Sequence, residues 1–237
     1  MRGNIMKIVI TAGGTSEPID DVRKITNTST GSLGLAIGNA FLQEHRDAVD
    51  KIYYLHGERA PYPDDQLVEH IRIGGTMDLK EQLSRVLREE KIDAVIHAMA
   101  VSDYMVDKVT TVEAIRTGTE SDKIQGNKIS SSIDDLAIIL KRTPKIIGMI
   151  KELSPKSKLV GFKLLSNVPH EELISVASAL MEKNSCDFVL ANDLSEIGAG
   201  MHRGYLIHRD GKVDEMTTKD EIGRMIARRI TEQEDER

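Results

Sequence analysis

The sequence predicts an α/β fold in which helices flank a mostly parallel β-sheet and an antiparallel hairpin forms one edge. Short apolar runs rich in β-branched residues alternate along the chain with segments of helical period. Such alternation implies right-handed crossovers between parallel strands, the arrangement of Rossmann-like folds. Near the end of the chain, the Asp-Gly turn of Arg209-Asp-Gly-Lys212 separates two apolar runs and predicts the edge hairpin.

The predicted elements follow one another in order. Residues 7–11 read as a buried strand, and residues 33–42 as the first helix. A short apolar run at 136–140 precedes Thr143-Pro144, where proline can open a helix. Further strands are expected at 51–55, 92–97, 159–163 and 187–191, further helices around 79–87, 173–181 and 222–230, and the hairpin strands at 204–208 and 213–216.

Composition narrows the class of protein. The 237 residues are 40% hydrophobic and 30% charged, which is ordinary globular usage and excludes a disordered chain. No apolar run approaches the ~18 residues of a transmembrane helix, and the net charge of −6 does not suit a nucleic-acid binder. With one cysteine, Cys186, and no recognisable signal peptide, we expect a cytoplasmic protein without disulfides, folded as a single domain over residues 1–237.

The stretch from about residue 106 to residue 133 is the least periodic part of the chain. It is rich in Thr, Ser, Gly and Lys. Long loops in compact domains are often functional, so we expect a flexible lid loop there.

Small and polar residues follow the first predicted strand. In Thr11-Ala-Gly-Gly-Thr15, Gly13 and Gly14 would let the backbone approach an anionic ligand, although a plain turn explains them equally well. The G-x-G-x-x-G dinucleotide fingerprint is absent. Next, the segment from Asn27 to Ser32 precedes the first helix, where it can bind an anion or simply cap the helix. The spacing alone favours the cap.

A second small-residue segment, His97-Ala-Met-Ala-Val-Ser-Asp103, follows the strand at 92–97. It could form a shelf for a ring, with Asp103 binding a sugar hydroxyl, a base or a metal, or it could be a buried strand end. Tyr104 and Lys108 match the Y-x-x-x-K pair of short-chain reductases, but they lie in the region interpreted as irregular, where this spacing does not align two side chains. The histidines show no metal-ligand spacing.

Several motifs in order resemble those of the phosphopantothenate–cysteine ligases, also called phosphopantothenoylcysteine synthetases. The match covers nearly the whole chain, and its first motif is long and specific. The motifs are Val9-Ile-Thr-Ala-Gly-Gly-Thr-Ser-Glu-Pro-Ile-Asp-Asp-Val-Arg23, Ile25-Thr-Asn27-Thr-Ser-Thr-Gly31, Ala100-Val-Ser-Asp103-Tyr104, Lys128-Ile-Ser-Ser, Arg142-Thr-Pro144-Lys-Ile-Ile147, Gly161-Phe162, Lys183-Asn184 and Ala191-Asn-Asp193-Leu-Ser195.

The resemblance implies a ligase of coenzyme A biosynthesis. A nucleoside triphosphate, with Mg²⁺, activates the carboxylate of 4′-phosphopantothenate as an acyl-nucleotidylate and releases pyrophosphate. The amine of L-cysteine then displaces the nucleoside monophosphate. Bacterial members typically use CTP, which would give an acyl-cytidylate and CMP, and animal members use ATP. An NAD(P)-dependent reductase or a catalytically silent nucleotide-binding module are the alternative functions from other classes.

The resemblance also implies roles for individual residues. Asn27 aligns with an asparagine that stabilises the activated intermediate, and Lys128 with a lid lysine needed for the first half-reaction. Metal ligands stay unassigned. The expected nucleotide contacts are Gly13, Gly14, Ser29, His97, Ala98, Met99, Asp103, Pro144, Lys145, Ile146, Ile147, Phe162 and Lys183.

Some residues depart from the bacterial pattern. Ser130 and Ser131 after the lid lysine, Lys163, and Ala179 at the place of a nucleotide lysine resemble the animal branch, whereas Ala191-Asn-Asp193 is of bacterial type. We expect CTP, with ATP as the alternative. The ligase motif begins at residue 7, which leaves no room for the flavin-dependent decarboxylase of fused members, so we expect a stand-alone ligase without flavin. The resemblance further implies a homodimer.

Overall fold

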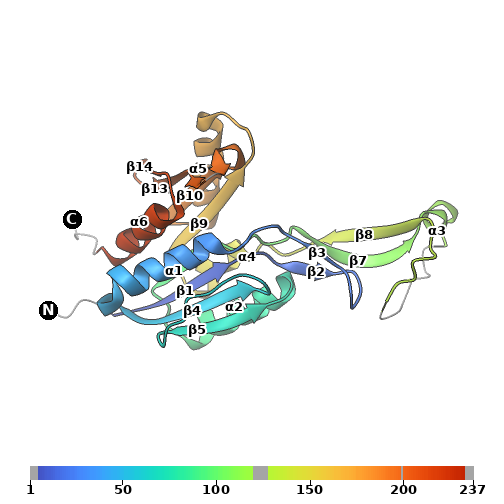
Figure 1. Cartoon of the computed structure of the whole chain (residues 1–237), viewed down its shortest axis with the longest axis horizontal. Coiled ribbons are helices and arrows are strands. Elements are labelled where there is room, and N and C mark those ends of the chain that lie inside the picture. Colours follow the sequence, from blue (N-terminus) through green and yellow to red (C-terminus); the bar gives the residue numbers. More distant parts are fainter. Residues whose placement is uncertain (1–4, 120–127, 199, 233–237) are drawn as a thin grey trace.

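An eight-stranded sheet forms the body of the molecule in the computed structural model, which describes residues 5–119, 128–198 and 200–232 (Figure 1). The strand order is β14-β13-β10-β9-β6-β1-β4-β5, and all pairings are parallel except those of β13 and β14. The predicted mostly parallel sheet with an edge hairpin is therefore confirmed. Its strands are β1 (Met6–Ala12), β4 (Val49–Gly57), β5 (Val68–Ile73), β6 (Ala94–His97), β9 (Lys158–Leu165), β10 (Phe188–Asp193), β13 (Gly204–His208) and β14 (Val213–Met216).

Helices cover both faces of the sheet. Helices α1 (Ser32–Glu44) and α6 (Lys219–Thr231) pack on one face, and α2 (Thr76–Glu89), α4 (Ile146–Leu153) and α5 (His170–Asn184) pack on the other. Because side chains alternate along a strand, Ile8 and Ile10 of β1 join the α1–α6 core while Val9 joins the core below α2. Both cores are built mainly from aliphatic side chains, as expected for a chain with 3% aromatic residues.

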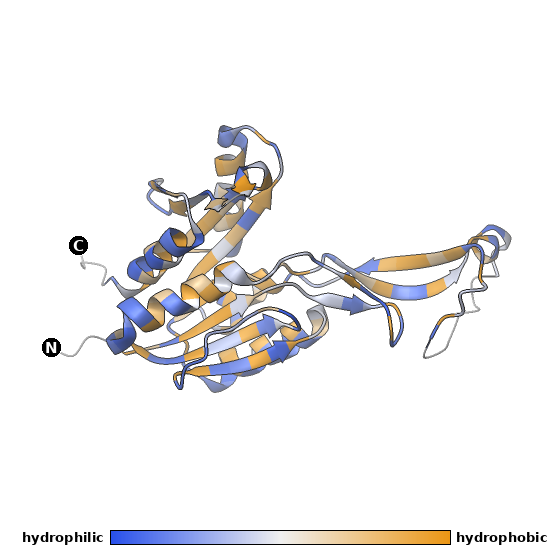
Figure 2. Ribbon diagram, in the orientation of Figure 1, coloured by the Kyte–Doolittle hydropathy of each residue, from blue (hydrophilic) through white to orange (hydrophobic). Residues whose placement is uncertain are grey.

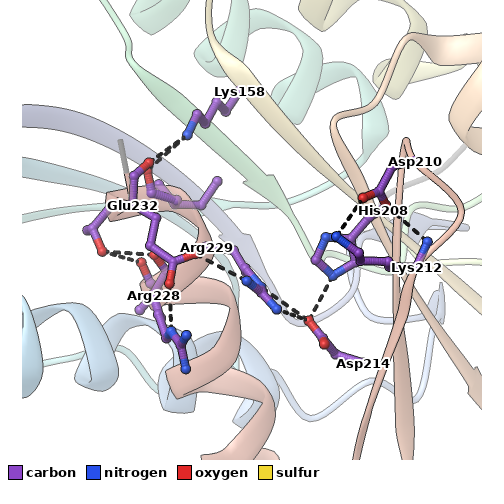
Figure 3. Close-up of polar contacts among 11 residues, drawn as sticks. Lys158, His208, Asp210, Lys212, Asp214, Arg228, Arg229 and Glu232 are labelled. Carbon is purple, nitrogen blue, oxygen red and sulfur yellow. Dashed lines mark hydrogen bonds and ion pairs between the residues drawn. The ribbon is translucent and has the colours of Figure 1, made fainter. Parts of the chain in front are cut away.

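The edge hairpin is joined to α6 by charged side chains (Figure 3). The Asp214 carboxylate of β14 accepts from His208 Nε2 at 2.7 Å and from Arg229 Nη2 at 2.7 Å. Arg229 also pairs with Glu232, whose carbonyl oxygen accepts from Lys158 Nζ at 3.2 Å. These contacts hold the last helix against the antiparallel edge of the sheet.

A two-stranded ribbon projects from the body, and it replaces much of the predicted lid loop (Figure 1). Strands β7 (Tyr104–Thr111) and β8 (Leu136–Arg142) pair antiparallel, and α3 (Val112–Thr117) follows β7. The prediction of an irregular segment over 106–133 is wrong for residues 106–117. The sequence does not show the side-chain alternation typical of a strand, because a register shift between Val106 and Lys108 interrupts it within β7. Residues 120–127 of the predicted lid lie outside the described part.

The ribbon also corrects the argument about Tyr104 and Lys108. Both residues lie on β7 and not in an irregular loop. Four residues along a strand span roughly 13 Å, so the two side chains still cannot form the close pair of the reductases.

Short elements complete the described chain. A hairpin of β2 and β3 lies at the base of the ribbon and leads directly to Asn27 (Figure 1). The short elements are β2 (Ser16–Pro18), β3 (Lys24–Thr26), β11 (Ile197–Gly198), β12 (Met201–His202) and the 3-10 turns η1 (Arg46–Ala48) and η2 (Leu194–Glu196).

Candidate functional site

The candidate site lies at the edge of the sheet where the parallel strands end. Strands β1, β4 and β6 are adjacent and parallel, so the loops that follow them meet at one edge, where ligands of open α/β sheets bind. The pairing of β1 and β6 continues into these loops, because Ala100 N–H donates to the Gly13 carbonyl and Thr15 N–H to the Ala100 carbonyl. Two hollows open there.

The larger hollow, which we call the Asn27 hollow, has a volume of about 830 Å³. It collects three of the predicted residues, Gly14, Asn27 and Ser29, together with the cations Lys24 and Arg59. Its lining is Gly14, Ser16, Val22, Lys24, Thr26, Asn27, Thr28, Ser29, Thr30, Gly57, Glu58, Arg59 and Ala60.

Glycines allow the loops around this hollow to approach one another. Gly13 and Gly31 both have positive φ angles, and a Cβ on either would lie within 2.7 Å of the Ala60 Cβ. A Cβ on Gly14 would lie 2.9 Å from the Asn27 Cβ. The glycines after β1 are thus required by backbone conformation and close packing.

Asn27 does not cap the first helix, so the capping interpretation is wrong. The N-cap of α1 is Gly31, which makes no side-chain hydrogen bond there. The Asn27 side chain instead crosses to the loop after β6. Its Nδ2 donates to the Ala100 carbonyl at 3.0 Å and to Ser102 Oγ at 3.2 Å. Asn27 is therefore part of the site by geometry as well as by motif.

The smaller hollow, which we call the Asp103 hollow, has a volume of about 180 Å³ and lies beyond β6 and β8. Eight of the thirteen predicted nucleotide contacts line it, although they are distant in the chain. The lining is His97, Met99, Val101, Ser102, Asp103, Pro144, Lys145, Ile146, Ile147, Phe162 and Leu180.

The polar groups of the Asp103 hollow differ in charge and exposure. His97 is buried, its Nδ1 lies 2.9 Å from Thr11 Oγ1, and burial lowers its pKa to about 4. Its ring is therefore neutral at pH 7. Asp103 and Lys145 form a 2.5 Å ion pair at the exposed rim. Exposed pairs contribute only ~0–1 kcal/mol to stability, so a bound polyanion can draw Lys145 away at little cost.

Lys128 is exposed, and the residue after it is anchored. The Ile129 N–H donates to Asp20 Oδ2 at 3.1 Å, and Arg23 Nη2 donates to the Ile129 carbonyl at 2.9 Å. Asp20 and Arg23 also pair with each other, and the Arg23 and Ile129 hydrogen bonds hold the Asp20 pKa well below its usual range. We call this contact the Asp20–Arg23 clamp. It ties the Lys128 segment to the hairpin that precedes Asn27.

Some predicted residues lie outside both hollows. Ala98 packs toward the α1–α6 core, Gly13 and Lys128 line neither hollow, and Lys183 is exposed in the last turn of α5. Among the described residues no three His, Cys, Asp or Glu side chains form a metal-binding group. Sequence reasoning missed the Asp20–Arg23 clamp and Ser102, although both stand inside the quoted motifs.

The two hollows adjoin, because Asn27 of one is hydrogen-bonded to Ser102 of the other. Lysines and an arginine surround them, and Lys24 pairs with Glu58, which also binds Arg72. The arrangement can hold two anionic ligands end to end, with cations to offset their repulsion and Asn27 near the junction.

Comparison with known proteins finds close relatives. The family model described as the DNA/pantothenate metabolism flavoprotein C-terminal domain matches residues 4–233. A crystal structure of the DNA/pantothenate metabolism flavoprotein from Streptococcus pneumoniae superposes with a TM-score of 0.85 at 35% identity, covering 95% of this chain and 98% of that one. A C-terminal domain of the coenzyme A biosynthesis bifunctional protein CoaBC shares the fold, with a TM-score of 0.71 at 23% identity over 97% of this chain and 96% of that one.

Among curated proteins, the bifunctional CoaBC of Thermococcus kodakarensis is 32% identical over 229 residues, which cover 93% of this chain and 51% of that protein. The chain thus spans about half the length of the curated relatives it matches. None of the described helices combines the length and apolar character needed to cross a membrane.

Proposed function

Since the chain belongs to the family of DNA/pantothenate metabolism flavoprotein C-terminal domains, we propose that it is a phosphopantothenate–cysteine ligase of coenzyme A biosynthesis. The observation that carries the proposal is the junction of two hollows at the Asn27–Ser102 hydrogen bond. A ligase that activates a carboxylate with a nucleotide must bring two anions together at one point, and this junction suits that requirement.

In the first half-reaction, 4′-phosphopantothenate occupies the Asn27 hollow and the nucleotide occupies the Asp103 hollow. A carboxylate oxygen of phosphopantothenate attacks the α-phosphorus, the bond to the β-phosphate oxygen breaks, and pyrophosphate leaves. Lys145 and Lys128 offset the negative charge, since fixed cations near developing charge lower the barrier. The Asp20–Arg23 clamp supports this role of Lys128, because it holds the neighbouring backbone in place.

In the second half-reaction, the amine of L-cysteine attacks the acyl carbonyl and the nucleoside monophosphate leaves. The amine loses a proton as the amide forms. Asn27 lies at the junction where the acyl group would sit. Because both of its Nδ2 hydrogens are donated to Ala100 and Ser102, its Oδ1 is the atom that would accept a hydrogen bond from the attacking amine and so stabilise this step. Binding all reactants in one orientation can supply effective molarities of ~10⁵–10⁸ M.

The nucleotide we propose is CTP, with ATP as the alternative. The neutral His97 ring and the apolar Met99 side chain, which both line the Asp103 hollow, suit a base held by shape and backbone contacts. Mg²⁺ is usually held by one or two carboxylates together with substrate phosphates. Asp103 is the one carboxylate lining the Asp103 hollow, so the residues fit a metal that arrives with the triphosphate. Mg²⁺ would neutralise phosphate charge there.

We further propose that the chain works as a cytoplasmic homodimer and needs no flavin for this reaction. Support for the dimer comes from the ribbon, whose strands carry hydrophobic segments far from the body (Figure 2). Exposed apolar side chains of this ribbon are Tyr104, Val112, Ile115, Ile138 and Leu140.

Pyrophosphate release tests the nucleotide assignment. The purified chain is given phosphopantothenate, cysteine, Mg²⁺ and either CTP or ATP, and kcat/KM is measured for each nucleotide. We expect the higher value with CTP. An equal or higher value with ATP would reverse the nucleotide assignment and leave the ligase proposal standing.

A further inference from the structure

A chain of buried polar side chains begins at a carboxylate below the site. Glu17 is 2% exposed, and its Oε1 accepts from the Thr76 N–H at 2.8 Å and from Thr76 Oγ1 at 2.7 Å. Thr76 is the first residue of α2, so Glu17 also meets the positive end of that helix. The single hydrogen of the Thr76 hydroxyl is shared between Glu17 Oε1 at 2.7 Å and, more weakly, Thr15 Oγ1 at 3.4 Å.

The chain continues through Thr15 to Ser102. Thr15 is fully buried, and its Oγ1 lies 3.4 Å from Thr76 Oγ1. Thr15 Oγ1 accepts from the Ser102 N–H at 2.9 Å and donates to Ser102 Oγ at 3.1 Å. Thr143 Oγ1 donates to the Ser102 carbonyl as well. The N–H, the carbonyl oxygen and the hydroxyl oxygen of Ser102 thus each have a partner within the protein.

Ser102 in turn orients Asn27. A backbone carbonyl can only accept, so the atom 3.0 Å from the Ala100 oxygen must be the amide nitrogen of Asn27. The second hydrogen of that nitrogen goes to Ser102 Oγ at 3.2 Å. With both hydrogens fixed, the plane and the direction of the Asn27 amide are fixed too.

We propose that Ser102 is a positioning residue for the ligase reaction, which orients the Asn27 amide at the junction of the two hollows and is itself held by Thr15, Thr76 and buried Glu17. The inference rests on the proposed function. Its distinguishing consequence is that Ser102 acts through Asn27. Without the Asn27 amide, the Ser102 hydroxyl has nothing to orient, and its removal costs no further activity.

A double-mutant cycle tests this coupling. Ser102→Ala, Asn27→Ala and the double variant are compared in pyrophosphate release and in formation of phosphopantothenoylcysteine. We expect Ser102→Ala to lose about 10-fold in amide formation, as for one hydrogen bond, with a smaller loss in pyrophosphate release. We expect the double variant to equal Asn27→Ala within about twofold, because coupled residues are not additive. Independent losses that multiply in the double variant would overturn the proposal.

Two variants of Thr15 provide a second, independent test of the proposal. Thr15→Ser keeps the hydroxyl and should retain near wild-type turnover, whereas the isosteric Thr15→Val should reproduce the half-reaction pattern of Ser102→Ala. An equal loss of turnover in both Thr15 variants would show that the packing of Thr15 matters and its hydrogen bond to Ser102 does not. Ser178→Ala, at a half-buried serine of α5 that lies outside both hollows, is the matched control and should leave activity unchanged. If wild-type chain makes no product with any nucleotide, the proposed function fails. If it makes product and the cycle is multiplicative, only the positioning role fails.

Discussion

At the scale of single residues, Asn27 and His97 both have to stay uncharged, for different reasons. Asn27 must keep a neutral amide that donates two hydrogen bonds, because its partners are the Ala100 carbonyl and Ser102 Oγ. His97 must stay neutral because it is buried at the floor of the Asp103 hollow. Substitutions that change the charge at either position therefore test whether the residue belongs to the site or only supports the fold.

Replacing Asn27 with Asp should abolish the overall reaction while nucleotide still binds. An ionised Asp only accepts, so it would set an oxygen against the Ala100 carbonyl and place a negative charge near the substrate carboxylate. Product formation and calorimetric nucleotide binding measure the two effects. Ser178→Ala, which lies outside both hollows, is the control. An Asn27→Asp enzyme with near wild-type turnover would remove Asn27 from the reaction.

Burial of His97 predicts a pH dependence of stability. The pKa of His97 falls from 6.5 to about 4 on folding, so the unfolded chain binds the proton more tightly. Titration of His97 therefore leaves the free energy of unfolding unchanged above pH 6.5. As the pH falls from 6.5 toward 4, it lowers that free energy by about 3 kcal/mol at most. Urea unfolding at pH 7 and pH 4.5 should show a smaller decrease for His97→Gln than for the wild type. The same decrease in both would contradict the assignment.

At the scale of elements, the loops at the carboxyl edge depend on close glycine packing. Gly31 has a φ of 78°, and a Cβ there would lie 2.5 Å from the Ala60 Cβ and 3.1 Å from the Gly13 nitrogen. Gly211, in the edge hairpin, has a φ of 85° but open space around it. Comparing Ala substitutions at the two glycines therefore separates the cost of a left-handed backbone from the cost of close packing.

Substituting Ala at Gly31 should destabilise the protein more than substituting Ala at Gly211. Each variant pays ~1–3 kcal/mol for a left-handed alanine, and only Gly31→Ala must also push Ala60 and the Gly13 loop apart. Thermal unfolding compares the pair, and Gly31→Ala should also weaken substrate binding in the Asn27 hollow. Equal melting temperatures of the two variants would show that the Gly13 and Ala60 loops move apart without lowering the stability of the protein.

The core strands and the edge hairpin were predictable from the sequence, whereas the edge strand β5 and the ribbon strand β7 were not. Strands such as β1 and β10 are buried on both faces and read as continuous apolar runs. Strand β5 lies at the sheet edge and mixes Glu69, His70 and Arg72 with its apolar residues, so it carries no such signal. The ribbon of β7 and β8 has no core of its own to pattern its side chains.

The site was predictable to the extent that it follows strand ends. The rule that ligands bind beyond the carboxyl ends of parallel strands points to Gly14 after β1 and Asp103 after β6. Asn27 follows the antiparallel strand β3, so only the motif pointed to it. The clamp on Ile129 could not be foreseen, because it joins positions more than a hundred residues apart and half of it is backbone. The role of Ser102 likewise depends on the exact approach of two loops.

At the scale of the whole molecule, the ribbon leaves apolar side chains exposed that a soluble monomer would bury. Leu140 and Ile138 lie on β8, and Val112 and Ile115 on α3. If these surfaces join two copies, as we propose, the ribbon couples assembly to the site, because β7 begins directly after Asp103.

Introducing a charge on the ribbon should therefore dissociate the dimer. Leu140→Asp is expected to sediment as a monomer with reduced turnover, because an unpaired carboxylate in an apolar contact is costly. Leu194→Asp changes a leucine of η2 that is somewhat more exposed than Leu140 (52% against 42%) and should stay dimeric. A wild-type chain that is fully active as a monomer would refute the dimer.

Product formation tests the central claim most directly. The purified chain is mixed with 4′-phosphopantothenate, L-cysteine and Mg²⁺, and with each of the four nucleoside triphosphates in turn, and pyrophosphate and phosphopantothenoylcysteine are quantified together by mass spectrometry. The account predicts one phosphopantothenoylcysteine for each pyrophosphate, with both requiring phosphopantothenate, and the fastest formation with CTP. Absence of the amide product with all four nucleotides, or pyrophosphate release that does not depend on phosphopantothenate, would contradict it.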